Sequence, residues 1–285
     1  MPTSRRKHTA RAAAAVAVAL AVTLVVLATV RHVAPTLLTG SGCTAEGNGQ
    51  AIPLAPGQAG IASTIAGVAR RDAMPRHAVT IAYAAALQES KLENLHYGDR
   101  DSVGIFQQRP SEGWGPTRQL EDPVYATTKF FAALTLVPRY LHIPVYRAAQ
   151  DVQHSADGAA YSQYQQIAAD LSRAFTGSSP RAVWCWYGDE PARPARLTAA
   201  AAALAKAFGP FAAHRAGDPV LAVHVTSTRD GWAVAAWVVS HASAYGIGQV
   251  RYQGYQWTAA GGNKGWIRER ARSRAPAPPG SVVLG

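Results

Sequence analysis

Glu89 is the residue whose setting best fits acid catalysis, because it stands where an apolar stretch ends and a polar loop begins. The stretch before it, AVTIAYAAAL at residues 78–87, places Ile81 and Ala85 on one helical face, with Ala86 one turn behind Glu89. Glu89 is therefore expected to be half-buried at a helix end. Since burial disfavours the charged form of a carboxyl group, such a residue can serve as a proton donor.

The loop after this helix carries further groups for the same chemistry. Asp99 and Asp101 are the nearest carboxylates in sequence, and either one would complete an acid pair of the kind that hydrolyses glycosidic bonds. The alternative is that both residues pin the loop, through Arg100 or through backbone N–H groups. The sequence leaves these two interpretations open.

Two motifs frame this loop: Glu89-Ser90 at the end of the predicted helix, and SVGIFQ at residues 102–107. Together they resemble the paired motifs of the lysozyme-like superfamily, which includes the goose-type lysozymes and the soluble lytic transglycosylases. The longer string YGDRDSVGIFQQRPSEGWG at residues 97–115, with DPVYA after it, resembles an actinobacterial subgroup of membrane-anchored cell-wall proteins. The resemblance covers residues 51–175, which is about half of the chain.

The resemblance implies an activity and a set of site residues. Glu89 would be the catalytic acid/base that cleaves the β-1,4 bond between N-acetylmuramic acid and N-acetylglucosamine in peptidoglycan, as in a lytic transglycosylase. The cation would be captured by the muramic 6-hydroxyl, leaving a 1,6-anhydro end, or by water if Asp99 or Asp101 assists. The expected substrate-binding residues are Ser90, Ser102, Gly104, Gln107, Gln108, Tyr97, Trp114 and Gln153. No cofactor and no metal is expected.

One motif of the family is missing. Lytic transglycosylases carry Ala-Tyr-Asn on a later helix, and the comparable stretch here is AAQDVQHSADGAAY at residues 148–161. Gln150, Gln153 and Tyr161 are the candidates to replace it, and the sequence does not choose among them. The missing motif also favours an alternative function, a catalytically degenerate protein that binds peptidoglycan or acts as a scaffold in wall remodelling.

Helical signals dominate the segment that holds these motifs, and strand signals are nearly absent from it. We therefore predict a mainly α protein: a lysozyme-like helical domain with a loop-built cleft, followed by a small α/β module that includes a helix at Leu197–Phe208 and a strand at Ser281–Leu284. The predicted boundaries are a cytoplasmic basic segment at 1–11, a transmembrane anchor at 12–30, an extracytoplasmic linker at 31–57, the lysozyme-like transglycosylase domain at 58–185, a second linker at 186–196 and the accessory module at 197–285.

The N-terminus predicts a membrane anchor. Arg5, Arg6, Lys7 and Arg11 precede Ala12–Val30, a run without a charged residue. At about 1.5 Å per residue, a helix of this length just crosses the ~30 Å hydrocarbon core of a bilayer. The basic cluster then keeps the N-terminus in the cytoplasm, which predicts a single-pass protein of the cell membrane with its C-terminal part outside. The alternative is a signal peptide that is cleaved to release a secreted protein.

Charge and cysteines predict partners outside the cell. The net charge of +11 attracts polyanions, which for an exported protein would be peptidoglycan and anionic wall polymers. Export also argues against nucleic acid as a partner. Cys43 and Cys185 would face an oxidising exterior, so we predict a disulfide between them. The nine histidines form no recognisable metal-ligand spacing.

Overall fold

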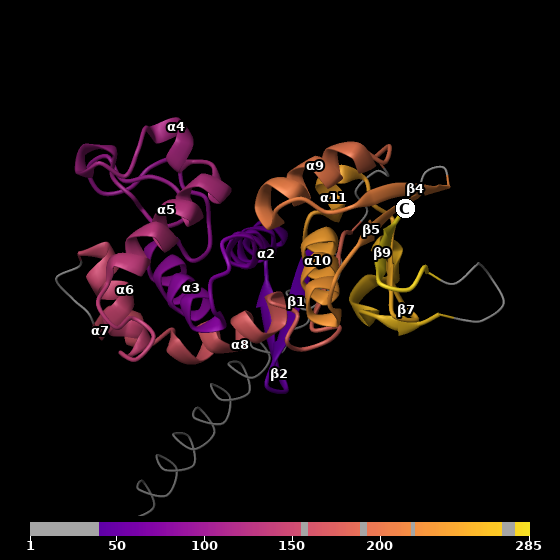
Figure 1. Ribbon diagram of the computed structural model, residues 1–285, viewed down its shortest axis with the longest axis horizontal. Coiled ribbons are helices and arrows are strands. Elements are labelled where there is room, and N and C mark those ends of the chain that lie inside the picture. Colours follow the sequence, from indigo (N-terminus) through magenta and orange to yellow (C-terminus); the bar gives the residue numbers. More distant parts are fainter. Residues whose placement is uncertain (1–39, 155–158, 189–192, 218–219, 270–276) are drawn as a thin grey trace, which may run out of the picture. The chain divides into compact units, whose positions relative to one another are not determined.

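The strands of this protein form two antiparallel sheets. The computed structural model describes residues 40–154, 159–188, 193–217, 220–269 and 277–285, and Figure 1 shows their arrangement. The first sheet has three strands in the order β2-β1-β3, with β1 at Gly42–Gly47, β2 at Gln50–Leu54 and β3 at Val183–Trp186. The second has six strands in the order β4-β5-β9-β6-β7-β8. The prediction of a mainly α fold, with a lysozyme-like helical domain and a small α/β module, is therefore wrong: the described chain combines helices with two antiparallel sheets.

The hairpin of β1 and β2 explains part of this error. Both strands lie within residues 31–57, a segment whose glycine and polar residues suggest a linker. Asn48 and Gly49 connect the strands with φ angles of 51° and 78°, and an Asn-Gly pair favours this kind of tight turn. β3 completes the sheet from a distant part of the chain, so no local pattern predicts that pairing.

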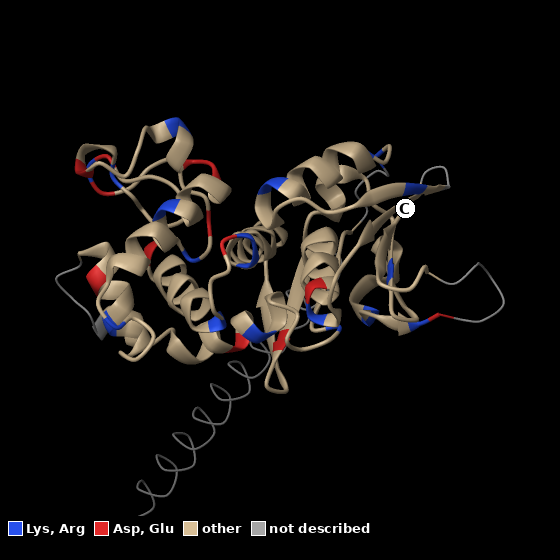
Figure 2. Ribbon diagram, in the orientation of Figure 1, with Lys and Arg blue, Asp and Glu red and all other residues tan. Residues whose placement is uncertain are grey.

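Helices α2 to α8 form the part of the chain that carries Glu89. α3, at Arg76–Ser90, is buried from Ala78 to Leu87 and packs against α2, α5, α6 and α8. Its charged residues stand near its two ends (Figure 2). The other elements of this part are α2 at Pro56–Arg71, the 3-10 turn η1 at Pro110–Glu112, α4 at Thr117–Leu120, α5 at Pro123–Leu136, α6 at Val145–Gln153, α7 at Ala159–Ser162 and α8 at Gln165–Phe175. A helix packed on so many sides fixes the place of the residues in its last turn.

The large sheet is covered by α10, at Thr228–Ser240, which contacts β6 and β9. The other elements are α9 at Leu197–Phe208, α11 at Ala242–Tyr245, η2 at Ala259–Lys264, β4 at Ala213–Gly217, β5 at Val220–His224, β6 at Gln249–Tyr252, β7 at Tyr255–Thr258, β8 at Ile267–Arg268 and β9 at Ser281–Leu284. α9 and β9 have the bounds that the sequence predicts. α2 packs against α3 and α5, in the helical part that carries Glu89, and against α9 and α10, in the part that contains the large sheet (Figure 1). This helix therefore connects the two parts.

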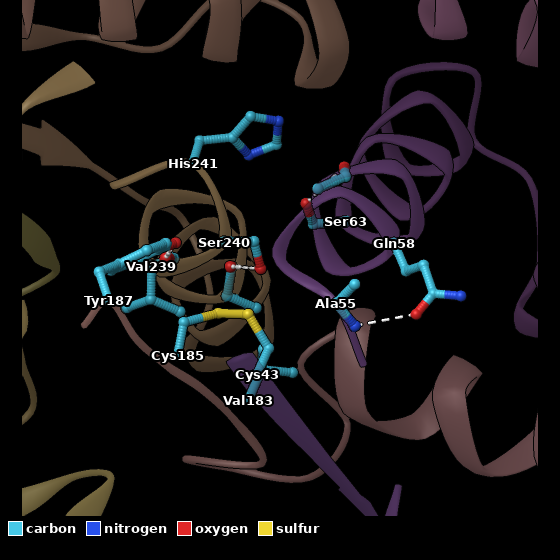
Figure 3. Close-up of a disulfide and its surroundings, with 12 residues drawn as sticks. Cys43, Ala55, Gln58, Ser63, Val183, Cys185, Tyr187, Val239, Ser240 and His241 are labelled. Carbon is cyan, nitrogen blue, oxygen red and sulfur yellow. Dashed lines mark hydrogen bonds between the residues drawn. A yellow bond between two sulfur atoms is a disulfide. The ribbon is translucent and has the colours of Figure 1, made fainter. Parts of the chain in front are cut away.

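The predicted disulfide between Cys43 and Cys185 is confirmed (Figure 3). The two residues are direct partners in the antiparallel pairing of β1 with β3. The carbonyl of Cys185 also accepts a hydrogen bond from Nε1 of Trp257, on β7, at 2.8 Å. The disulfide thus joins the first strand of the described chain to a strand that is itself bonded to the large sheet.

The predicted membrane anchor, Ala12–Val30, lies outside the described residues. Among the helices that the structure does describe, each is too short or too polar to cross a membrane. The residues from Gly42 to Gly285 belong to one compact unit.

Candidate active site

Glu89 is half-buried in the last turn of α3, where the chain turns sharply. Lys91 and Leu92 follow in the left-handed conformation, with φ angles of 58° and 61°, and the Leu92 amide donates to the Ala86 carbonyl at 3.1 Å. A cap of this kind provides partners for the last carbonyls of a helix. The carboxyl group of Glu89 is therefore presented at a well-defined helix end.

Ser90 is buried and ties this helix end to the loop that follows. Its hydroxyl lies 2.8 Å from the Ile105 carbonyl and 3.1 Å from the Ala86 carbonyl, and it accepts a hydrogen bond from the Glu93 amide at 3.2 Å. Ser90 is not among the described residues that line the cavity beside Glu89. It positions the SVGIFQ loop relative to Glu89.

A cavity of about 420 Å³ opens beside Glu89. This volume is within the usual range of ligand pockets. It brings together eight residues singled out from the sequence: Glu89, Asp99, Ser102, Gln107, Gln108, Trp114, Gln153 and Tyr161. The rest of its described wall is formed by Arg100, Arg109, Glu112 and His154. Much of the wall comes from one continuous segment, residues 99–114, and a local sequence motif can therefore point to it.

Tyr161 makes the contact that orients Glu89. Its hydroxyl donates to Oε1 of Glu89 at 2.6 Å, and the tyrosine is only 1% exposed. Oε2 of Glu89 makes no hydrogen bond within the part of the chain that the structure describes. Among the candidates to replace the Ala-Tyr-Asn motif, Tyr161 is the one that reaches Glu89, whereas Gln153 donates to the Phe106 carbonyl at 2.7 Å. Gln150 is not among the described residues of the cavity wall.

Asp101 pins the loop. Its carboxylate accepts hydrogen bonds from the Ser111 amide at 2.7 Å, the Ser111 hydroxyl at 2.9 Å and Nε of Arg109 at 3.0 Å. The bond from the Ser111 amide is the main cause that lowers the pKa of Asp101 to about 2, and the bonds from the Ser111 hydroxyl and Arg109 act in the same direction. For Asp101, the geometry fits the loop-pinning interpretation.

Two other carboxylates, Asp99 and Glu112, border the cavity. Asp99 is exposed and lies 3.9 Å from Nε of Arg100. Glu112, which the sequence reasoning missed, forms an ion pair with Arg109, three positions earlier. The signal was the run Arg-Pro-Ser-Glu, because a proline that begins a 3-10 turn brings positions i and i+3 together.

The backbone of the SVGIFQ loop requires glycine at one position. Gly104 has a φ of 78°, and a Cβ there would lie 2.4 Å from the Leu120 carbonyl oxygen. Gln107 braces the same loop, since its Nε2 donates to the carbonyls of Gly104 at 3.1 Å and of Tyr97 at 3.3 Å. Gly104 therefore shapes the loop without lining the cavity, and Gln107 does both.

Gln108 offers an unused acceptor next to the cavity. The residue is 2% exposed, and its Nε2 donates to the Ala126 carbonyl at 3.3 Å. Because the Ala126 carbonyl can only accept a hydrogen bond, Nε2 of Gln108 must point toward it. Oε1 of Gln108 therefore points away from Ala126. That oxygen has no partner among the described residues. A buried acceptor without a partner costs roughly 1–3 kcal/mol, and a ligand N–H that reached it would remove this cost.

The two aromatic candidates differ in position. Trp114 is half-buried and lines the cavity, and its carbonyl lies 3.5 Å from the Tyr125 hydroxyl. Tyr97 is 73% exposed and is not among the described residues of the cavity wall. Of the two, Trp114 is the ring placed to stack on a ligand in the cavity.

The cavity wall also carries two cationic side chains, those of Arg100 and Arg109. The sequence suggests Arg100 only as a residue that holds the loop, and it gives no role to Arg109. Within the described residues, no group of histidine, cysteine, aspartate and glutamate is arranged to hold a metal ion. A comparison of the chain with protein-family models found no match, and a comparison with curated proteins found none either.

Proposed function

We propose that this protein is a peptidoglycan-cleaving muramidase of the lytic transglycosylase type, in which Glu89 is the single catalytic acid/base. The observation that carries the proposal is the pairing of Glu89 with Tyr161 at the wall of a polar cavity. A half-buried carboxyl group that is held at one oxygen and open at the other suits proton transfer to a glycosidic oxygen. The resemblance of the Glu-Ser and SVGIFQ motifs to lysozyme-like proteins supports the same activity.

In this mechanism one carboxyl group moves two protons. Glu89 donates its proton to the oxygen of the β-1,4 bond as that bond breaks, and the muramic ring takes up the positive charge. The Glu89 carboxylate then accepts the proton of the muramic 6-hydroxyl, whose oxygen bonds to C1 and closes a 1,6-anhydro ring. Glu89 is protonated again at the end. The hydrogen bond from Tyr161 keeps the carboxyl group oriented during both transfers.

Two of the other carboxylates near the cavity, those of Asp101 and Glu112, support this single-acid route. Asp101 is engaged by Ser111 and Arg109, and Glu112 is paired with Arg109, so both are committed to holding the loop. Gln108 would accept a hydrogen bond from the N–H of a 2-acetamido group, and Trp114 would stack on a sugar ring. The disulfide supports an oxidising location, as expected for a protein that acts on the wall.

Mass spectrometry of the fragments released from purified sacculi tests the proposal. The full chain should release muropeptides that end in 1,6-anhydromuramic acid, and Glu89→Gln should lower the rate of release by about 10² to 10⁴. Glu93→Gln is the matched control, because Glu93 is an exposed acid one helical turn further along the sequence.

Release at the wild-type rate by Glu89→Gln would overturn the role of Glu89. Reducing ends in place of anhydro ends would indicate hydrolysis, and Asp99 would then be the second carboxylate to substitute. Binding of sacculi without any cleavage by the wild-type protein would favour the catalytically degenerate alternative.

A further inference from the structure

A second cavity, of about 350 Å³, lies among α2, α3 and α10 and is lined by the arginines Arg70, Arg76 and Arg229. Each comes from a different helix: Arg70 from the end of α2, Arg76 from the start of α3 and Arg229 from the start of α10. Figure 2 colours the charged segments of these helices. None of the three lines the cavity beside Glu89. Guanidinium groups that come from separate elements to one cavity suit an anionic ligand.

This arginine cavity keeps an excess of positive charge. Asp230 also lines it, but its carboxylate is paired with Arg70, whose Nε lies 3.2 Å away. Arg229 donates from Nε to the Thr176 carbonyl at 3.2 Å, a neutral partner that leaves its charge uncompensated. Arg76 is exposed, and its guanidinium makes no hydrogen bond or ion pair with a described residue. The charges of Arg76 and Arg229 are thus available to a ligand.

The start of α10 adds to this preference for an anion. Ser227 caps the helix by accepting a hydrogen bond from the Asp230 amide at 3.0 Å, and Ser227 itself lines the cavity. The earlier amides of the first turn have no partner within the helix. In a helix of 13 residues, these amides and the helix dipole favour negative charge at this end.

The remaining wall shows what else the ligand carries. It is apolar and consists of Ala66, Ala69, Ala73, Met74, Val79 and Ala233, together with the methyl-bearing Thr176. Ala66, Ala69, Val79 and Ala233 are already buried, whereas Ala73 is exposed and Met74 and Thr176 are half-buried. An organic group attached to the anion would cover Ala73, Met74 and the Thr176 methyl group, which a bare inorganic ion would leave open to solvent. Phosphate oxygens accept hydrogen bonds from several guanidinium groups at once. We propose that this cavity binds the phosphate group of a phosphoester, with Arg76 and Arg229 on the phosphate oxygens and the organic part against the apolar wall.

An NMR titration of the full chain with dimethyl phosphate, in parallel with inorganic phosphate, tests this site. The double variant Arg76→Gln/Arg229→Gln should bind dimethyl phosphate about tenfold more weakly than the wild type, because it loses two charge-assisted contacts. The control Arg118→Gln/Arg139→Gln removes the same net charge from exposed residues elsewhere and should bind as the wild type does.

If both double variants bind dimethyl phosphate equally weakly, the binding depends only on the net charge of the protein, and the proposed site is overturned. Failure of the wild type to bind dimethyl phosphate at low salt would overturn it as well. Binding of inorganic phosphate alone would identify the free ion as the ligand and overturn the phosphoester. All these outcomes are independent of the activity proposed for Glu89, since neither Arg76 nor Arg229 lines that cavity.

Discussion

The cavity beside Glu89 and the arginine cavity are built in opposite ways. The first takes much of its wall from residues 99–114, a loop braced by its own hydrogen bonds. The second takes one arginine from each of three helices, α2, α3 and α10. A braced loop holds its side chains as long as the loop is intact, whereas the arginine cavity requires three helices to stay packed together. Changes in the loop should therefore affect the first cavity, and changes in helix packing the second.

Loss of the disulfide should have the largest effect on stability and should affect both cavities. Cys43→Ser/Cys185→Ser removes a cross-link between residues 142 positions apart, and the chain-entropy model assigns about 4 to 5 kcal/mol to a loop of that size. β1 packs against α8, and β3 packs against α10, so the cross-link supports both parts. Chemical denaturation followed by circular dichroism measures the change. Reduction of the disulfide in the wild-type protein should cause the same loss of stability as the double serine variant. An unchanged denaturation midpoint in both the variant and the reduced protein would contradict the stabilising role of the disulfide.

Gly104→Ala should damage the Glu89 cavity and spare the arginine cavity. Left-handed backbone costs an alanine about 1–2 kcal/mol, and the contact with the Leu120 carbonyl adds an overpacking cost, for a total of about 3 kcal/mol. Gly113→Ala is a close control, because Gly113 also has a positive φ, of 82°, but a Cβ there meets nothing within 4 Å.

Gly113→Ala should therefore lose only about 1 kcal/mol of unfolding free energy. Glycan cleavage should fall in the Gly104 variant while the binding of dimethyl phosphate persists. Equal losses of stability in the two alanine variants would show that the contact with Leu120 carries no cost, and a loss of phosphoester binding would show that the two cavities are coupled.

Acid should weaken the packing of α2 with α10, on which the arginine cavity depends. His241 follows α10 and its ring stacks on Trp237, with 4.1 Å between the ring centroids. A Cβ at Gly60 of α2 would lie 3.5 Å from Nε2 of His241, and Figure 3 shows His241 next to α2. Burial lowers the pKa of His241 from 6.5 to about 4. The unfolded chain then binds a proton at higher pH than the folded chain does. The contribution of neutral His241 to the free energy of unfolding is fully present above about pH 6.5. It should be lost as the pH falls towards 4, by up to about 3 kcal/mol.

His241→Phe tests this pH dependence, since phenylalanine keeps a ring against Trp237 but does not titrate. The stability of the wild type relative to the variant, followed through their denaturation midpoints, should fall as the pH drops from about 6.5 to 4, because only the wild type takes up a proton on unfolding there. Asp101, whose pKa is lowered to about 2, adds a separate loss of stability below about pH 4 that both proteins share. If the stability of both proteins depends on pH in the same way above pH 4, His241 is not the cause of the loss of stability in acid.

The same contrast explains what the sequence could predict. Glu89 and much of its cavity could be found because their residues are close in sequence, and the loop motif lies just after the helix that ends at Ser90. The disulfide could be predicted because only two cysteines are present. The helix at Leu197–Phe208 could be predicted because its alanine-rich composition is a local property.

The features that the sequence did not predict depend on contacts between distant residues. Tyr161 was one of several candidates, because its bond to Glu89 spans 72 positions. The small sheet pairs β1 with a strand from the other side of the helical segment. The arginine cavity combines residues of α2, α3 and α10, each of which alone looks like an ordinary charged residue at a helix end.

The smallest of these effects should come from Tyr161→Phe, which removes the hydroxyl that bonds to Glu89 and keeps the ring that fills the core. A hydrogen bond to a charged group contributes roughly 1.5–3 kcal/mol, so glycan cleavage should slow by about 10- to 100-fold. The loss should appear in kcat rather than KM, because the bond orients the proton donor. Tyr164→Phe is the control: it removes a hydroxyl that contacts Nζ of Lys91 at 2.5 Å, near the same helix end but away from the Glu89 carboxyl group. An equal loss in both variants would mean that Tyr161 acts through general packing. A loss confined to Tyr161→Phe, with phosphoester binding intact, would make the contact between α3 and α7 part of the catalytic site and separate that site from the arginine cavity.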